Sequence, residues 1–219
     1  NNLITSFEFM NKESIQILEK NETKISNLKK NNCYCLVELS NFYSIESFND
    51  FISSRIDFEK INTDDFIISK SESENKKLWS YRESIPIAER KESFIVAHDI
   101  SIPLMQVEKF INDTSKKIKK YSNGSKIINF GHLGDNNLHY NVLVTNYSSK
   151  TKKTICKSIN KIVYESVNKF DGSISAEHGI GQLKRNELKK HKNFDEIKKM
   201  RLIKNIFDPK NILNPGKVI

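Results

Sequence analysis

Two histidines lie on either side of a short turn in the stretch FGHLGDNNLHYN, residues 130–141. We predict a strand on each side of a four-residue connection at 134–137, where Asp and Asn tolerate tight turns. In such a hairpin His132 lies opposite His139, with β-carbons about 5 Å apart. Asn141 shares the face of His139, because side chains alternate along a strand. This spacing suits two imidazoles on one metal ion, although a hairpin with two surface histidines has the same pattern.

A second stretch, GSISAEHGIG at residues 172–181, contains Glu177 next to His178. Together with His132 and His139, Glu177 completes a set of two imidazoles and one carboxylate, which can hold a divalent metal and leave positions open for a substrate. His178, with an ordinary pKa near 6.5, is then the candidate base. The alternative is a solvated loop with a chance Glu-His pair. The same donor set also describes non-haem iron oxygenases.

The elements that must position these residues follow from hydrophobic periodicity. Predicted strands cover residues 3–10, 32–39, 66–69, 94–102, 126–130 and 138–145, and predicted helices cover residues 12–20, 44–55, 72–89, 104–121, 151–170 and 200–207. Arg82 falls on the inward stripe of its helix, where covering apolar surface with its stem is the alternative role, and Pro86 is expected to end or kink that helix. The order predicts an α+β fold: a mainly antiparallel sheet with helices packed on one face, ferredoxin-like, and a C-terminal helical tail.

Composition narrows the class of protein. The 219 residues carry a formal net charge of +9, but only five of the 36 basic residues are Arg and the lysines are scattered, which argues against a nucleic-acid site. A non-catalytic basic binding module remains the competing class. No apolar run approaches the roughly 18 residues that span a bilayer. Cys33 and Cys35 fit one face of a strand as small apolar residues, so we expect a reducing, cytoplasmic compartment.

Five stretches, in order along nearly the whole chain, resemble the C-terminal domain of the FAD-linked D-2-hydroxy-acid dehydrogenases, a family that includes D-2-hydroxyglutarate and D-lactate dehydrogenases. They are LWSYRESIP (78–86), HDISIP (98–103), GHLGDNNLHYN (131–141), GSISAEHGIGQLKR (172–185) and LNPGK (213–217). The resemblance implies that residues 1–219 form the cap domain of a flavoprotein, that residues 186–219 return to an N-terminal FAD-binding domain missing from these residues, and that this chain alone is inactive.

The resemblance also implies a mechanism, in which a D-2-hydroxy acid becomes a 2-oxo acid and hydride passes to FAD. His132, His139 and Glu177 match the ligands of a divalent metal, with zinc expected. His178 matches the base that takes the hydroxyl proton. The electron acceptor that reoxidises the flavin is not indicated, and self-association into a homo-oligomer is left open.

The resemblance implies roles for three further residues. At two other positions the sequence departs from the family pattern. Arg82 and Asn141 match residues that bind the substrate, Arg82 through its carboxylate, and Asn214 matches a position beside the cofactor. Asn136 stands where the family usually has Gly, which requires a left-handed backbone. Ala97 stands where many relatives have a Lys that helps to bind substrate carboxylate, so the identity of the 2-hydroxy acid stays open.

Overall fold

The computed structural model describes residues 3–21, 31–40, 44–55 and 67–219. The chain divides into two compact units: unit 1 contains residues 1–95 with 128–134, and unit 2 contains residues 96–127 with 135–219. Helices and antiparallel strands occur in both, so the predicted α+β class is confirmed.

Unit 1 is built around the strand β1 (Ile4–Asn11), which pairs antiparallel with β2 (Cys33–Leu39) on one side and with the end of β5 (Lys126–His132) on the other. In this register Glu8 lies opposite His132. Side chains alternate along β1, so Glu8 and Met10 are buried on one face. A charged residue therefore shares the inner face of a strand with an apolar one.

The helices of unit 1 are α1 (Lys12–Lys20), α2 (Ile45–Arg55) and α3 (Glu72–Glu89). Asn11 caps α1 by accepting the backbone N–H of Ser14, and the apolar stripe of α1 packs against α3. Pro86 lies inside α3, which continues to Glu89, so the helix does not end at this residue. Pro86 lacks the N–H that would bond to the carbonyl of Arg82, but the last turn continues because Arg90 N–H still bonds to Pro86.

Two further expectations for unit 1 are corrected. Cys33 and Cys35 share a face of β2, but both are exposed; β2 is the outermost of the described strands in this sheet. A strand at 66–69 does not form over residues 67–69, and residue 66 lies outside the described part of the chain.

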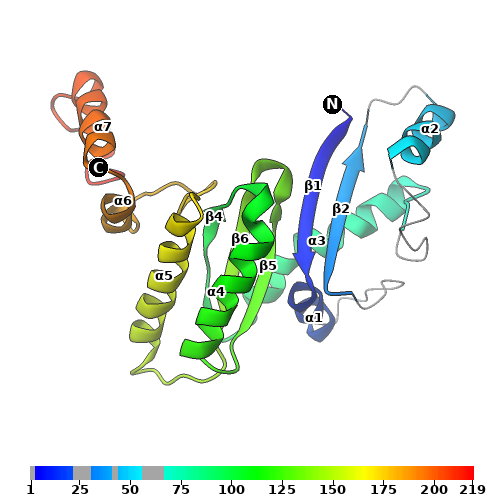
Figure 1. Ribbon diagram of the computed structural model, residues 1–219, viewed down its shortest axis with the longest axis horizontal. Coiled ribbons are helices and arrows are strands. Elements are labelled where there is room, and N and C mark those ends of the chain that lie inside the picture. Colours follow the sequence, from blue (N-terminus) through cyan, green and yellow to red (C-terminus); the bar gives the residue numbers. More distant parts are fainter. Residues whose placement is uncertain (1–2, 22–30, 41–43, 56–66) are drawn as a thin grey trace. The chain divides into compact units, whose positions relative to one another are not determined.

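Unit 2 pairs β4 (Asp99–Ser101) antiparallel with β6 (Asn137–Leu143), so that Asp99 lies opposite His139. The helices α4 (Val107–Tyr121) and α5 (Lys152–Lys169) run side by side (Figure 1). Phe110 of α4 contacts Tyr140 of β6 edge-on, with ring centroids 5.5 Å apart. Tyr140 therefore faces the core, and Asn141 shares the opposite face with His139, as alternation predicts.

The predicted strand 94–102 is divided into β3 (Ile95–Val96) and β4. The break falls at Ala97 and His98, where the His98 N–H donates to the side chain of Asn141 at 3.0 Å. This side-chain partner replaces a ladder bond and explains why one apolar run forms two strands.

Short turns surround the strands of the predicted hairpin. A 3₁₀ turn, η3 (Leu133–Asp135), follows β5, and Asn136 has a φ of 59°, so the left-handed backbone expected there is confirmed. Another 3₁₀ turn, η2 (Leu104–Gln106), precedes α4. The tail contains α6 (Arg185–His191) and α7 (Phe194–Phe207), and α7 is longer than predicted because Asn193 and Glu196 form a capping box. Among the described residues, every helix is too short or too polar to cross a membrane.

Candidate functional site

The loop that carries Glu177 and His178 is attached to β4 by backbone contacts. Ser101 and Ser173 form an antiparallel bridge, with N–H···O distances of 2.9 and 2.8 Å. Gly172 makes this approach possible, because a β-carbon there would lie 2.3 Å from the carbonyl oxygen of Ser101. The loop therefore starts at a position fixed by the strand.

Asp99 holds the centre of the same loop. Its Oδ2 accepts the backbone N–H groups of Glu177 at 3.0 Å and His178 at 2.8 Å. Burial opposes ionisation of Asp99, but these two hydrogen bonds and the nearby His178 and His139 rings outweigh it and lower its pKa. Asp99 is therefore a carboxylate at neutral pH.

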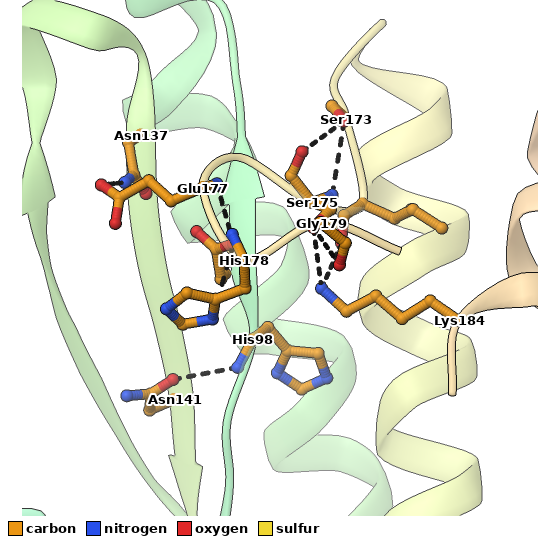
Figure 2. Close-up of polar contacts among 11 residues, drawn as sticks. His98, Asn137, Asn141, Ser173, Ser175, Glu177, His178, Gly179 and Lys184 are labelled. Carbon is orange, nitrogen blue, oxygen red and sulfur yellow. Dashed lines mark hydrogen bonds and ion pairs between the residues drawn. The ribbon is translucent and has the colours of Figure 1, made fainter. Parts of the chain in front are cut away.

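Lys184 forms a second attachment of the loop. Its Nζ donates to the carbonyl oxygen of Ile174 at 2.9 Å and lies 3.4 Å from Oγ of Ser175. Burial lowers the pKa of Lys184, and attraction to Asp99 acts in the opposite direction. Figure 2 shows Lys184 reaching back to the loop from the segment that follows it.

Two predicted metal ligands and the predicted base come together within unit 2. Ligand atoms of His139 and Glu177 lie within 4.8 Å of each other, and Glu177 also accepts a hydrogen bond from the amide of Asn137. The ring centroids of His139 and His178 are 6.1 Å apart. The side chain of His178 is 67% exposed, and its Nδ1 is 3.6 Å from Asp99 Oδ2, which leaves Nε2 as its outward nitrogen.

Asn141 lies beside these residues on β6, and its Oδ1 accepts the N–H of His98. His98 is fully buried, with Nδ1 2.8 Å from the carbonyl oxygen of Tyr140 and Nε2 3.0 Å from Oδ1 of Asn160. Burial lowers the pKa of His98 to about 4, despite both contacts. A neutral imidazole thus supports the strand that carries the site.

Arg82 and His132, which were also predicted as site residues, lie in unit 1, and both contact Glu8. Glu8 accepts from Arg82 Nε at 2.9 Å and from His132 Nδ1 at 2.6 Å. The side chains of Glu8 and Arg82 are 2% and 8% exposed, and the Arg82 guanidinium lies 4.7 Å from the centre of the Phe130 ring. Because Nδ1 of His132 is used by Glu8, Nε2 is the nitrogen that could bind a metal.

The structure thus places His139, Asn141, Glu177 and His178 in unit 2, and Arg82 and His132 in unit 1. Asn214 adopts a left-handed backbone, with a φ of 47°, in the turn where Lys217 N–H bonds to its carbonyl.

Sequence reasoning assigned no role to Glu8 or Asp99. Alternation along LITSFEFM gave no signal for Glu8, because Ser6 shares its face and the apolar Phe7 and Phe9 lie on the other one. Asp99 lies in the stretch HDISIP, but its contact with residue 177 spans 78 positions and has no local signal.

Comparison with known proteins places the chain in a family. Residues 2–218 match the family of FAD linked oxidases, C-terminal domain. D-2-hydroxyglutarate dehydrogenase of Stutzerimonas stutzeri (strain A1501) is 37% identical over 161 residues, which are 70% of this chain and 33% of that protein. The mitochondrial D-2-hydroxyglutarate dehydrogenase of Arabidopsis thaliana is 31% identical over 222 residues, which are 99% of this chain and 38% of that protein.

A solved structure shares the fold. The 4-ethylphenol oxidase from Gulosibacter chungangensis, in its isoeugenol complex, superposes with a TM-score of 0.59 over 97% of this chain and 47% of that one, at 13% identity. The chain belongs to the FAD linked oxidase C-terminal domain family. It spans a third or slightly more of the length of the two curated relatives.

Proposed function

We propose that this chain is the substrate-side part of a flavoprotein that oxidises a D-2-hydroxy acid to a 2-oxo acid. The observation that carries the proposal is the convergence of His139, Glu177 and His178 in unit 2, with the last two fixed by Asp99. Membership of the FAD linked oxidase family supports flavin as the hydride acceptor, and the names of the two curated relatives support a 2-hydroxy acid as the substrate.

We assign His132, His139 and Glu177 as ligands of a divalent metal, with zinc expected. The residues fit this role in their chemistry, because two imidazoles and one carboxylate suit Zn²⁺ and leave room for a substrate. The contact between His132 Nδ1 and Glu8 resembles the carboxylate partner that orients many metal-binding histidines. Asn137 similarly orients Glu177.

In the proposed reaction the metal and the flavin would supply some of the chemistry, and residues of this chain supply the rest. When bound, the metal would polarise the substrate hydroxyl and the flavin would accept the hydride from C2. His178 takes the hydroxyl proton at Nε2, since Asp99 lies on its Nδ1 side. Loss of one proton and one hydride converts the CH–OH group into a carbonyl, so the reaction balances.

Binding of the substrate is assigned to Arg82 and Asn141. The Nε of Arg82 is fixed by Glu8, which orients the terminal guanidinium nitrogens for a carboxylate. The Asn141 amide is fixed through His98. Ala97 is exposed and supplies no charge for a second carboxylate, so we propose the class of D-2-hydroxy acids without naming one member.

The deciding experiment uses the intact protein that contains this chain. Anaerobic mixing with D-lactate, D-2-hydroxyglutarate and their L-enantiomers should bleach the flavin absorbance with a D-acid only. Reduction by neither D-acid, or equal reduction by both enantiomers, would remove the proposal. A non-haem iron oxygenase shares the donor set, but it would contain iron and no flavin, so metal and flavin analysis separates the two classes.

The remaining proposals concern the rest of the protein. We propose that residues 186–219 contact a flavin-binding domain and that Asn214 lies near the cofactor there. The three cysteines are free, which supports a reducing compartment, although the name of the Arabidopsis relative is mitochondrial.

A further inference from the structure

We propose that Asp99 is the positioning residue of this site, because its buried carboxylate holds the peptide groups of the metal ligand Glu177 and the base His178 in place. The roles of Glu177 and His178 rest on the proposed function. The anchoring of their backbone by Asp99 does not.

The side chains that need positioning are themselves poorly supported by the loop. Glu177 and His178 are both exposed, and the loop around them has no regular secondary structure. Gly179 and Gly181 follow with φ of 71° and 53°, and a β-carbon at either would meet nothing within 4 Å. Metal ligands and bases must be held to fractions of an ångström, so a rigid element has to supply what the loop lacks.

The strand β4 is that element. Asp99 lies opposite His139 in the ladder with β6, and two residues later Ser101 pairs with Ser173 at the start of the loop. The short strand β4 therefore contacts both β6, which carries His139, and the loop that carries Glu177. Asp99 extends this attachment to the two residues that react, by direct bonds to their N–H groups.

The two oxygens of Asp99 are used differently. Oδ2 accepts both N–H groups, whereas Oδ1 is buried and has no hydrogen-bond partner among the described residues. An asparagine can place its single oxygen at the Oδ2 position and its amino group at the Oδ1 position, and it then keeps both backbone bonds. Alanine removes both. The two substitutions therefore separate anchoring from simple occupancy of the site.

A matched control lies elsewhere in unit 2. Asp208 is also buried, and it accepts the N–H groups of Ile212 and Leu213, both at 2.9 Å. Each oxygen of Asp208 accepts one N–H and the carboxylate also pairs with Lys204, so Asp208→Ala removes a buried carboxylate that holds a different loop.

The test measures two quantities in the intact protein: hydrogen exchange of the amides of residues 177 and 178, and Zn²⁺ affinity by titration of metal-free protein. We expect Asp99→Ala to speed exchange at both amides and to weaken Zn²⁺ binding by about 10- to 100-fold, the usual effect of losing a group that orients a ligand. Asp99→Asn should restore most of both. Asp208→Ala should leave Zn²⁺ affinity and the exchange at 177 and 178 unchanged.

Several outcomes would overturn the proposal. Asp99→Ala with wild-type exchange and affinity would show that the loop holds itself. Asp99→Asn as damaged as Asp99→Ala would show that the backbone bonds are not what matters, and an equal loss of Zn²⁺ affinity in Asp208→Ala would indicate general destabilisation. If the wild type binds no Zn²⁺, the metal part of the proposed function fails, but amide exchange still decides the role of Asp99.

Discussion

The imidazole rings of His139 and His178 lie close together in unit 2, and the proposed function assigns them different roles. In that proposal His139 is a metal ligand, and His178, whose side chain is exposed, is the base. Replacing His178 by Gln should therefore leave the bound metal in place and slow flavin reduction by about 10²- to 10⁴-fold, the range typical of general bases. Metal analysis and stopped-flow flavin absorbance measure the two effects in the intact protein.

His139→Ala is the matched comparison for this prediction. It should lower metal content and rate together, because it removes a ligand. If His178→Gln reduces the flavin at the wild-type rate, His178 is not the base. If His139→Ala keeps its metal, the ligand assignment is wrong.

Glu8 is expected to matter for stability, because its carboxylate is buried. It forms an ion pair with Arg82, and both side chains are almost inaccessible to water. Glu8→Ala leaves the Arg82 charge buried without this partner, which should reduce the free energy of unfolding by about 3–5 kcal/mol. Urea unfolding of the intact protein measures the change.

Glu83 provides the control for this prediction, because it lies next to Arg82 on α3 but is exposed. Glu83→Ala should change the stability by less than about 0.5 kcal/mol. Similar losses for the two variants would contradict the view that the buried pair, rather than charge on this helix, stabilises unit 1.

At the scale of elements, Gly172 determines how closely the loop approaches β4. A methyl group there would collide with the carbonyl oxygen of Ser101 at 2.3 Å and with Cδ1 of Ile102 at 2.8 Å. Gly172→Ala should break the Ser101–Ser173 bridge and cost about 1–3 kcal/mol of stability. Gly179→Ala introduces strain at a φ of 71° without a collision, so it should cost about 1–2 kcal/mol and preserve the bridge. Amide exchange of residue 173 separates them: protection kept in Gly172→Ala would contradict the prediction.

His98, which lies between β3 and β4, is expected to make the stability of the protein depend on pH. The pKa of His98 is lowered by burial to about 4, below its ordinary value near 6.5. As the pH falls from 6.5 towards 4, the unfolded chain takes up a proton that the folded chain does not, so the contribution of His98 is present above 6.5 and is lost in this window, by at most about 3 kcal/mol. Urea unfolding between pH 7 and 4 should show a shallower decline for His98→Gln than for the wild type; parallel curves would contradict the assignment.

The strength of the sequence predictions varied with the range of the interaction. The shared face of His139 and Asn141 follows from alternation, which is local, and the structure agrees. The left-handed backbone at Asn136 was expected from the family resemblance, and it is present. Of the two outcomes expected at Pro86, an end or a kink, the end does not occur, because the helix continues to Glu89 with one backbone bond missing. Asp99 could not be predicted, since its partners lie in a loop far along the chain.

At the scale of the molecule, the chain spans only part of its relatives, and α7 presents apolar residues to solvent. Leu202, Ile203, Ile206 and Phe207 recur at spacings of three and four, and Phe207 is 79% exposed. Such a stripe is typical of a helix that packs against another surface. We propose that this surface belongs to the flavin-binding part of the intact protein.

Ile206→Glu tests that proposal, because Ile206 is 74% exposed and a charge there would have to be desolvated on contact. We expect a loss of bound FAD, seen as a several-fold higher dissociation constant in flavin fluorescence titration of the intact protein, with Zn²⁺ content unchanged. Asn205→Glu adds the same charge at the exposed neighbouring position, about 100° around α7 from Ile206, and should leave FAD binding unaltered. Equal FAD affinity in Ile206→Glu and Asn205→Glu would show that the stripe does not face the flavin-binding part. A loss of Zn²⁺ in Ile206→Glu would show instead that α7 supports unit 2 itself.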